Sequence, residues 1–171
     1  MVEKAPYTVL KKVDQIEIRQ YPEIVLATVR KNDDDSAFGE LFNYISGANV
    51  KQEKIKMTAP VITSEKIPMT APVITKKDYM AFVMPSKYTK ENIPTPTNSN
   101  VEIEVKEKRK IATIRFSGYA TKRKTKRQIE KLIEKVNDNN FKTKGEPFLM
   151  RYNSPFAPGF LRRNEVAIEL I

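Results

Sequence analysis

An internal duplication is the sequence feature that most constrains the fold. The segment IEIRQYPEIVLATVR at 16–30 aligns without gaps to VEIEVKEKRKIATIR at 101–115. Five residues of the first copy recur unchanged in the second: Glu17, Ile18, Ala27, Thr28 and Arg30. A helical pattern follows each copy at nearly the same distance, and strand patterns follow each helix. The chain is therefore predicted to contain two strand-strand-helix-strand halves.

The predicted elements give a single domain over residues 1–171, a length that suits one hydrophobic core. Strands are predicted at 7–13, 16–21, 23–29, 79–84, 101–105, 110–116, 147–152 and 165–170. Helices are predicted from Ser36, a candidate N-cap, to about 44–46, and over 121–137. The halves cover about 7–84 and 101–171, and a linker rich in Pro, Thr, Asn and Ser joins them at 85–100.

The duplication predicts an α+β fold. Two β-β-α-β halves that pack together form a distorted antiparallel barrel or curved sheet with a helix on each side. The seam between such halves is where a ligand pocket is expected.

A second and closer repeat lies inside the first half. KIKMTAPVIT at 54–63 and KIPMTAPVIT at 66–75 match at nine of ten positions, with a spacing of 12 residues. Both copies are rich enough in β-branched residues to form strands, and a turn at Ser64 and Glu65 is predicted to fold one copy back on the other. Pro60 and Pro72 lack an amide donor, so they are expected at an edge or a bulge.

The composition excludes several classes of enzyme. The chain has no His and no Cys, which rules out Ser-His and Cys-His catalysis, disulfides and ordinary zinc sites. No arrangement of carboxylate, Lys or Tyr residues suggests a catalytic centre, so we predict a binding protein with no catalytic and no metal-ligating residues. The charged start and the absence of a long apolar run favour a cytoplasmic protein without a membrane span, and we expect a monomer.

The formal net charge of +10 indicates either a solvated basic surface or an anionic partner. The densest basic run is Lys122-Arg123-Lys124-Thr125-Lys126-Arg127. Nucleic-acid binding through this run is one hypothesis, but no aromatic platform or groove-reading motif accompanies it.

The first predicted helix has more apolar surface than a single contact needs. Its apolar side chains fill an arc of about 160°, whereas those of the second helix span about 100°. Deeper burial of the helix and a lined cleft both explain the excess, and Phe38 and Phe42 lie towards its far edge. Met57, Met69, Met80 and Met84 cluster in the central strands, where methionine serves either as core or as an adaptable binding surface.

Several motifs together resemble the SOUL haem-binding family over nearly the whole chain. They are VDQIEIRQYPEIVLATV, AFGELFNYISGAN leading into KIKMTAPV, FSGYA at 116–120, and the closing NSPFAPGFLRRNEVAIEL. The resemblance implies the barrel-like fold above, which effector-binding domains of some transcription regulators share. It also implies non-covalent binding of haem or another tetrapyrrole in an apolar cleft by the first helix.

The resemblance assigns a set of cofactor-binding residues. The apolar candidates are Phe38, Leu41, Phe42, Tyr44, Ile45 and Met57, and the basic candidates for the propionates are Lys51, Lys54, Arg162 and Arg163. The chain departs from some family members because it has no His to act as axial ligand and no Lys or Arg on the first helix. Tyr, Met or Lys remain as iron ligands, or the iron is unligated.

The predicted function is therefore a non-enzymatic carrier or buffer for haem or another tetrapyrrole. The alternatives are a module that binds small-molecule effectors or drugs without a haem role and, as a minority hypothesis, a nucleic-acid binder.

Overall fold

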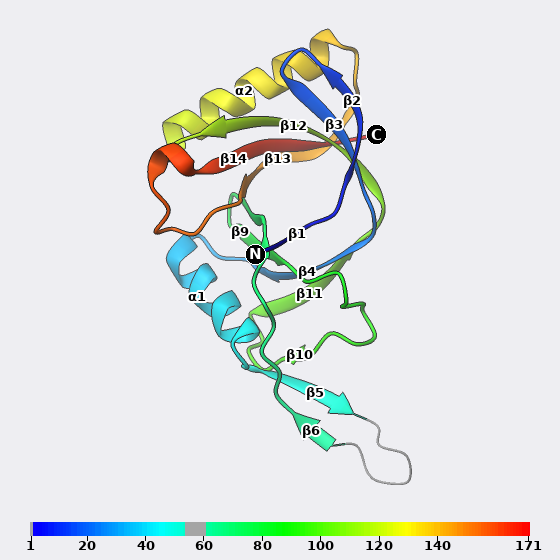
Figure 1. The fold of residues 1–171 in the computed structure, drawn as a ribbon, viewed down its shortest axis with the longest axis vertical. Helices are drawn as coiled ribbons and strands as arrows, with labels where there is room; N and C mark the ends of the chain where they lie inside the picture. Colours follow the sequence, from blue (N-terminus) through cyan, green and yellow to red (C-terminus); the bar gives the residue numbers. More distant parts are fainter. Residues whose placement is uncertain (1, 54–60) are drawn as a thin grey trace.

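The computed structural model describes residues 2–53 and 61–171, which form an antiparallel sheet of nine strands with two helices (Figure 1). The strand order is β11-β4-β9-β8-β13-β14-β12-β3-β2. The strands of this sheet are β2 (Thr8–Val13), β3 (Ile16–Tyr21), β4 (Ile24–Val29), β8 (Val73–Lys76), β9 (Tyr79–Val83), β11 (Val101–Lys106), β12 (Arg109–Ser117), β13 (Thr143–Arg151) and β14 (Arg163–Leu170). The helices are α1 (Asp34–Ile45), α2 (Lys122–Asp138) and the short 3-10 helix η1 (Gly159–Leu161). Smaller pairings join β1 (Glu3–Lys4) to β7 (Thr70–Ala71), and β5 (Asn49–Glu53) to β6 (Val61–Thr63) and β10 (Thr95–Pro96).

The sheet carries the symmetry of the duplication. When β3 is exchanged with β11, β4 with β12, β8 with β13 and β9 with β14, the order of these eight strands reads the same in reverse. Strand β2, at one edge of the sheet, has no counterpart. The helices follow the same rule, because α1 packs on β4, β9 and β11 while α2 packs on β12, β14 and β3. The predicted α+β class with duplicated halves is confirmed. The edge strands β11 and β2 do not pair with each other, so the described residues form a curved sheet and not a closed barrel.

Helix α1 begins three residues earlier than predicted. The carboxylate of Asp33, not the hydroxyl of Ser36, caps it by accepting hydrogen bonds from the backbone amides of Asp35 and Ser36 at 3.3 Å. The chain turns away after Ser46 at Gly47, whose positive φ of 127° favours glycine. The predicted end of the helix is therefore correct.

Where the structure describes them, the two copies of the closer repeat do not pair with each other, which corrects the predicted hairpin between them. In the first copy β6 pairs with β5, whereas in the second copy β8 pairs with β9 and β13. The two-residue turn at Lys77 and Asp78 explains this choice, because it returns the second copy directly onto β9. The main sheet has one place between β9 and β13, which β8 fills, and β6 lies outside this sheet, at the bottom of Figure 1. Pro72 lies at the break between β7 and β8, as expected, and Pro60 lies outside the described residues.

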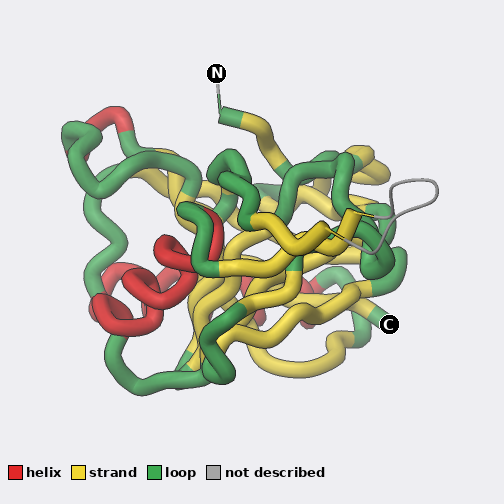
Figure 2. Tube along the Cα trace, turned by 90° about the horizontal axis from the view of Figure 1, so that it is seen from below, coloured by secondary structure: helices red, strands yellow, loops and turns green. Residues whose placement is uncertain are grey.

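Three buried clusters fill the molecule. One lies between α1 and the sheet, one between α2 and the sheet, and the third lines the middle of the sheet's curve. Figure 2 shows the fold from below, with α1 beside the strands. Within the described part of the chain, neither helix has the length and apolar character of a membrane span.

Candidate functional site

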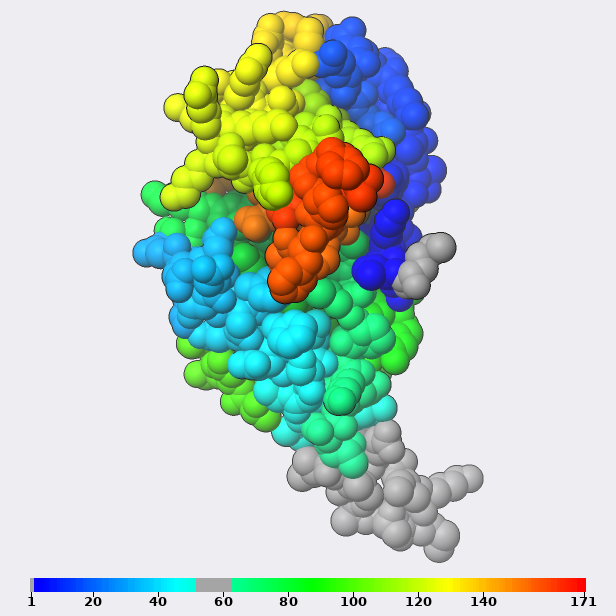
Figure 3. Space-filling model, turned by 60° about the vertical axis from the view of Figure 1, so that its left-hand side comes forward, coloured from blue at the N-terminus to red at the C-terminus, as the bar shows by residue number. Residues whose placement is uncertain are grey.

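An apolar cavity of about 470 Å³ lies beside α1. Its walls come from α1, from the segment around β7 and β8, from the start of β9, and from the chain that follows β13. The apolar side chains that define it are Phe38, Phe42, Met69, Val73, Met80 and Phe156. Figure 3 shows the loop of residues 153–161, in orange to red, lying across this face between α1 in cyan and α2 in yellow. The volume falls within the roughly 300–1,000 Å³ that is usual for small-molecule sites.

Two stacked phenylalanines form the helical wall of the cavity. The rings of Phe38 and Phe42, one helical turn apart, are 6.1 Å between centroids and inclined by 13°. Phe38 is half-buried and meets Phe82 of β9 edge-on at 5.2 Å, which fixes its position. Phe42 remains 47% exposed. The pair therefore offers aromatic surface to a flat apolar ligand.

The cavity also has a polar corner. The Nη2 atom of Arg151, at the end of β13, donates hydrogen bonds to Asp34 at 3.3 Å and to Thr75 at 3.5 Å. Its Nε atom and the Oγ1 atom of Thr70 are buried and have no hydrogen-bond partner among the described residues. Both residues line the cavity. The Arg151 side chain as a whole is 39% exposed, so its guanidinium is suited to a ligand that carries hydrogen-bond acceptors.

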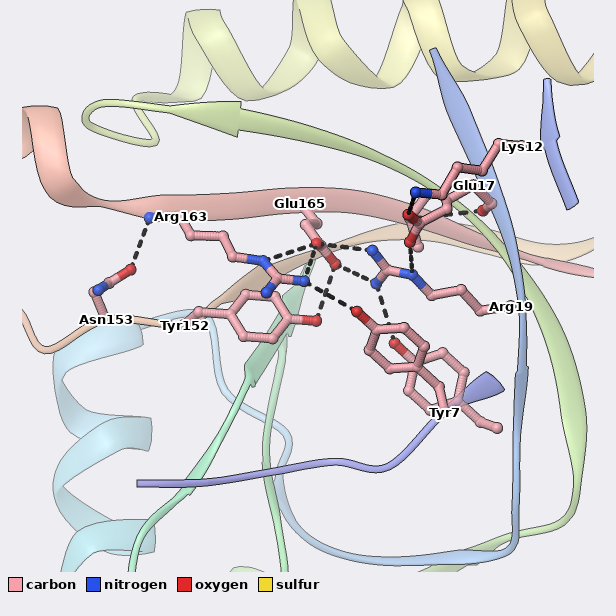
Figure 4. A network of polar contacts seen from close by, with 10 residues as sticks. Tyr7, Lys12, Glu17, Arg19, Tyr152, Asn153, Arg163 and Glu165 are labelled. Carbon is pink, nitrogen blue, oxygen red and sulfur yellow. Dashed lines mark hydrogen bonds and ion pairs between the residues drawn. The ribbon is translucent and has the colours of Figure 1, made fainter. Parts of the chain in front are cut away.

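A second polar cluster occupies the middle of the curved sheet (Figure 4). The buried carboxylate of Glu165 accepts hydrogen bonds from Arg19 at 2.6 and 3.0 Å, from Arg163 at 2.6 and 3.0 Å, and from the Tyr152 hydroxyl at 2.9 Å. The guanidinium of Arg163 also donates to the Tyr7 hydroxyl at 3.3 Å. The five residues come from both halves of the chain and from its first segment, so this cluster holds the two halves together.

The charge state of Glu165 follows from these contacts. Burial favours its neutral form, but the hydrogen bonds and charges of Arg19 and Arg163 outweigh burial and hold the pKa of Glu165 below its ordinary value. Burial together with the nearby Tyr21 and Glu165 raises the pKa of Tyr152. The carboxylate is therefore ionised and fully paired, which suits a structural clamp better than an acid or a base.

The whole chain matches one protein family. Residues 2–169 match the family described as SOUL heme-binding protein. The chain belongs to the SOUL family. It is 32% identical over 166 residues to heme-binding protein 2 of Mus musculus, covering 90% of this chain and 77% of that protein. It is also 32% identical over 160 residues to heme-binding protein 2 of Homo sapiens, covering 89% and 77%.

Solved structures share the fold of this SOUL chain at low sequence identity. The crystal structure of the EcmrR C-terminal domain has a TM-score of 0.58 and 12% identity, over 92% of this chain and 97% of that one. A hydrolase from Listeria innocua has a TM-score of 0.59 and 11% identity, over 95% and 94%. These likenesses show the effector-binding-domain-like fold alone.

The structure divides the predicted apolar residues of α1 into two groups. Phe38 and Phe42 line the cavity. Leu41, Tyr44 and Ile45 are buried on the side of the helix that faces the sheet. The Tyr44 hydroxyl donates to the carbonyl of Pro94 at 2.7 Å, and burial raises the pKa of that phenol. The wide apolar arc of α1 thus serves both purposes, core packing and a lined cavity.

The described basic candidates Lys51, Arg162 and Arg163 do not line the cavity. Lys51 pairs with Glu65 at 3.1 Å in the small sheet, and Arg162 donates to the carbonyls of Ala157 and Pro155. Arg163 belongs to the Glu165 cluster. The remaining two predictions, Lys54 and Met57, lie outside the described residues.

Sequence reasoning missed Arg151 as the basic residue of the cavity. Arg151 reaches α1 because β13 pairs with β8, a contact between distant parts of the chain. The available signal was its position at the end of a strand directly before the Pro-rich loop. Among the described residues, no group of three or more His, Cys, Asp or Glu is placed to hold a metal ion.

Proposed function

We propose that this SOUL-family chain binds haem or a related tetrapyrrole non-covalently in the cavity beside α1. Its role would be that of a carrier or buffer in the cytoplasm and not that of an enzyme. The observation that carries the proposal is the combination of the Phe38–Phe42 wall with the partly exposed guanidinium of Arg151 in one cavity. Membership of the family and the names of the relatives support the same ligand class.

The cavity residues fit the organic part of haem. The macrocycle would lie against Phe42 and Phe38, with Met69 and Phe156 on other walls. Burial of a few hundred Å² of apolar surface contributes on the order of 5–10 kcal/mol before the cost of association. Arg151 would hold a propionate, and because its side chain is 39% exposed, that charge adds about 1 kcal/mol or less.

The iron would be weakly held by this chain. Haem supplies a redox-active, Lewis-acidic iron when it is bound. The sequence contains no imidazole and no thiol, and the cavity offers the thioethers of Met69 and Met80 as its soft donors. A ligand held mainly by apolar contacts exchanges readily, which suits a carrier.

The shortage of iron donors also favours a second candidate, a flat apolar ligand without metal. The same cavity would then serve as a small-molecule effector site. Metal-free protoporphyrin IX distinguishes the two, because it keeps the macrocycle and the propionates and lacks only the iron.

Titration of the full chain with hemin tests the proposal. We expect a saturable change in Soret absorbance with a Kd of about 1–50 μM, and a loss of at least about tenfold in affinity for Phe42→Asp. Leu10→Asp is the matched control, because Leu10 is 51% exposed on β2, away from the cavity, against 47% for Phe42. Equal affinity of the two variants would contradict the proposed site. Binding of protoporphyrin IX equal to that of hemin would favour the metal-free candidate.

A further inference from the structure

Large apolar side chains project from the loop between β13 and β14. Phe156 is 95% exposed, Phe160 is 81% exposed and Leu161 is 61% exposed. The loop is ordered by its own contacts, because Arg162 Nε donates to the carbonyl of Ala157 at 2.8 Å and its guanidinium lies 4.5 Å above the ring of Tyr119. The apolar groups are therefore held outward by a fixed backbone. Clustered exposure of this kind marks an interaction surface in a soluble domain.

The amino end of α2 is basic, although the helix dipole disfavours positive charge at that end. Five of the first six residues of α2 are Lys or Arg, and the first turn contains no acidic residue. Because the helix dipole is positive at this end, cations here destabilise the helix. Helix α1 has the favourable arrangement, with Asp34 and Asp35 in its first turn. Within the described part of the chain, Lys122, Arg123, Lys126 and Arg127 are exposed and form no ion pair. An anionic partner outside the chain accounts for this placement better than helix stability does.

The apolar loop and the basic helix start are neighbours. Gly159 packs so tightly on Tyr119 that a Cβ atom at Gly159 would lie 2.5 Å from the ring. Tyr119 stands three residues before the start of α2. Figures 1 and 3 show η1 and its loop next to the amino end of α2, and Figure 2 shows the loop projecting from the body of the molecule.

We propose that residues 155–161 and the first two turns of α2 form a docking surface for an anionic lipid bilayer. Apolar tips would enter the boundary between headgroups and acyl chains, while the adjacent cations would bind anionic headgroups. A fluid bilayer receives a projecting loop without a complementary hollow, which a folded protein partner would need. Nucleic acid would use the cations, but it leaves the aliphatic Leu161 and the prolines of the loop without a role.

The docking surface adjoins the cavity. Phe156 and Pro155 belong to both, so the docked face is the one on which the cavity opens. If the proposed function holds, an apolar ligand dissolved in the bilayer would enter the cavity without crossing water. Docking itself does not depend on which ligand the cavity holds.

Co-sedimentation of the full chain with vesicles tests the docking surface. We expect binding to phosphatidylcholine vesicles with about 30% phosphatidylserine, and at least about tenfold weaker binding to phosphatidylcholine alone. Phe160→Ser with Leu161→Ser, and separately Arg123→Glu with Arg127→Glu, should each reduce the partition coefficient at least about tenfold. The matched control is Lys108→Glu with Lys110→Glu, two exposed cations at the opposite end of β12, which should bind like the parent chain.

A fluorescence probe reports the contact directly. The sequence contains no Trp, so Phe160→Trp provides a single emitter at the loop tip. Its emission should shift to the blue with anionic vesicles and remain unchanged with neutral ones. Unchanged emission, or loop and helix variants that bind vesicles like the parent chain, would overturn the proposal. So would binding of RNA that both variants abolish in the absence of any vesicle binding. Hemin titration of the same variants separates this outcome from failure of the proposed function, because neither Phe160 nor Leu161 lines the cavity.

Discussion

Helices α1 and α2 occupy equivalent places in a duplicated sheet, yet the surfaces beside them differ. Helix α2 buries a narrow stripe that includes Leu132 and Val136, and its other faces are charged. Helix α1 buries Leu41, Tyr44 and Ile45 and still has Phe38 and Phe42 left over to line a cavity. The duplicated backbone therefore provides two similar helix positions on the sheet. The side chains of each helix determine what the surface beside it can bind.

The clamp between the halves should give the largest effect on stability. Glu165→Gln removes the counter-charge of Arg163 and one of the two carboxylates that Arg19 contacts, leaving Arg19 with Glu17 at 2.5 Å. Because this charge cluster is largely buried, we expect the free energy of unfolding to fall by about 3–5 kcal/mol in urea titrations. Glu169→Gln in the same strand is the control, because Glu169 is partly exposed and its ion pairs are long, at 3.8 and 4.0 Å. That control should lose less than about 1 kcal/mol.

The same clamp predicts a pH dependence. Because the pKa of Glu165 is lowered in the folded state, its stabilising contribution is present above the ordinary carboxyl pKa and is lost as the pH falls through the lowered value. The difference in unfolding free energy between the parent chain and Glu165→Gln should therefore shrink as the pH falls below the ordinary carboxyl pKa. A difference that stays constant from neutral to strongly acidic pH would contradict the assignment of an ionised Glu165.

Truncation of one fully buried leucine in either helix should destabilise the protein to a similar extent. Leu41→Ala and Leu132→Ala each remove a fully buried side chain, and each should lower the free energy of unfolding by about 2–5 kcal/mol. Hemin affinity separates them, since Leu132 is remote from the cavity and its variant should bind normally while folded. If only Leu132→Ala lost hemin affinity, the ligand would bind beside α2 and not beside α1.

The cavity-lining phenylalanines of α1 should affect ligand affinity more than the stability of the fold. Phe42 is half-exposed, so Phe42→Ala should lower the free energy of unfolding by less than about 1 kcal/mol. Phe38 also packs on Phe82, so Phe38→Ala should lower it by about 1–3 kcal/mol. Both variants should lose hemin affinity. If Phe42→Ala destabilised the protein as much as Leu41→Ala, Phe42 would be a core residue and not part of a cavity wall.

Charge at the helix starts should give the smallest effects, with opposite signs. Arg123→Glu places an acid in the first turn of α2 and should raise the free energy of unfolding by about 0.3–1 kcal/mol at low salt. Asp35→Lys at α1 should lower it by a similar amount. Thermal unfolding at low and high salt checks both, because added salt should remove most of each difference.

Much of the architecture was accessible from local sequence patterns. The duplicated 16–30 and 101–115 segments predicted that the same order of strands and helix recurs. They did not predict that the halves interlock, with β3 paired to β12 and β4 paired to β11. The wide apolar arc of the first helix predicted that α1 has more apolar surface than packing on the sheet requires. The pairing of the closer repeat was not accessible, because it depends on competition between β6 and β8 for one place beside β9.

The site was less accessible than the fold. Phe38 and Phe42 lie on one helix, and their spacing placed them together on one face. Arg151 and Thr70 come from segments that meet them only through the tertiary fold, so no spacing in the sequence could place them there. The basic candidates chosen by resemblance, such as Arg163, instead serve contacts that stabilise the sheet and its loop.

Methionine methyl NMR tests the cavity most directly. Met69 and Met80 line it, whereas Met84 and Met150 are buried and do not line it. Addition of metal-free protoporphyrin IX to the full chain with labelled methionine methyl groups should shift the Met69 and Met80 signals through the ring current of the macrocycle. The Met84 and Met150 signals should remain in place. Saturable binding that moves Met150 and leaves Met69 and Met80 unshifted would show that the ligand occupies another part of the molecule.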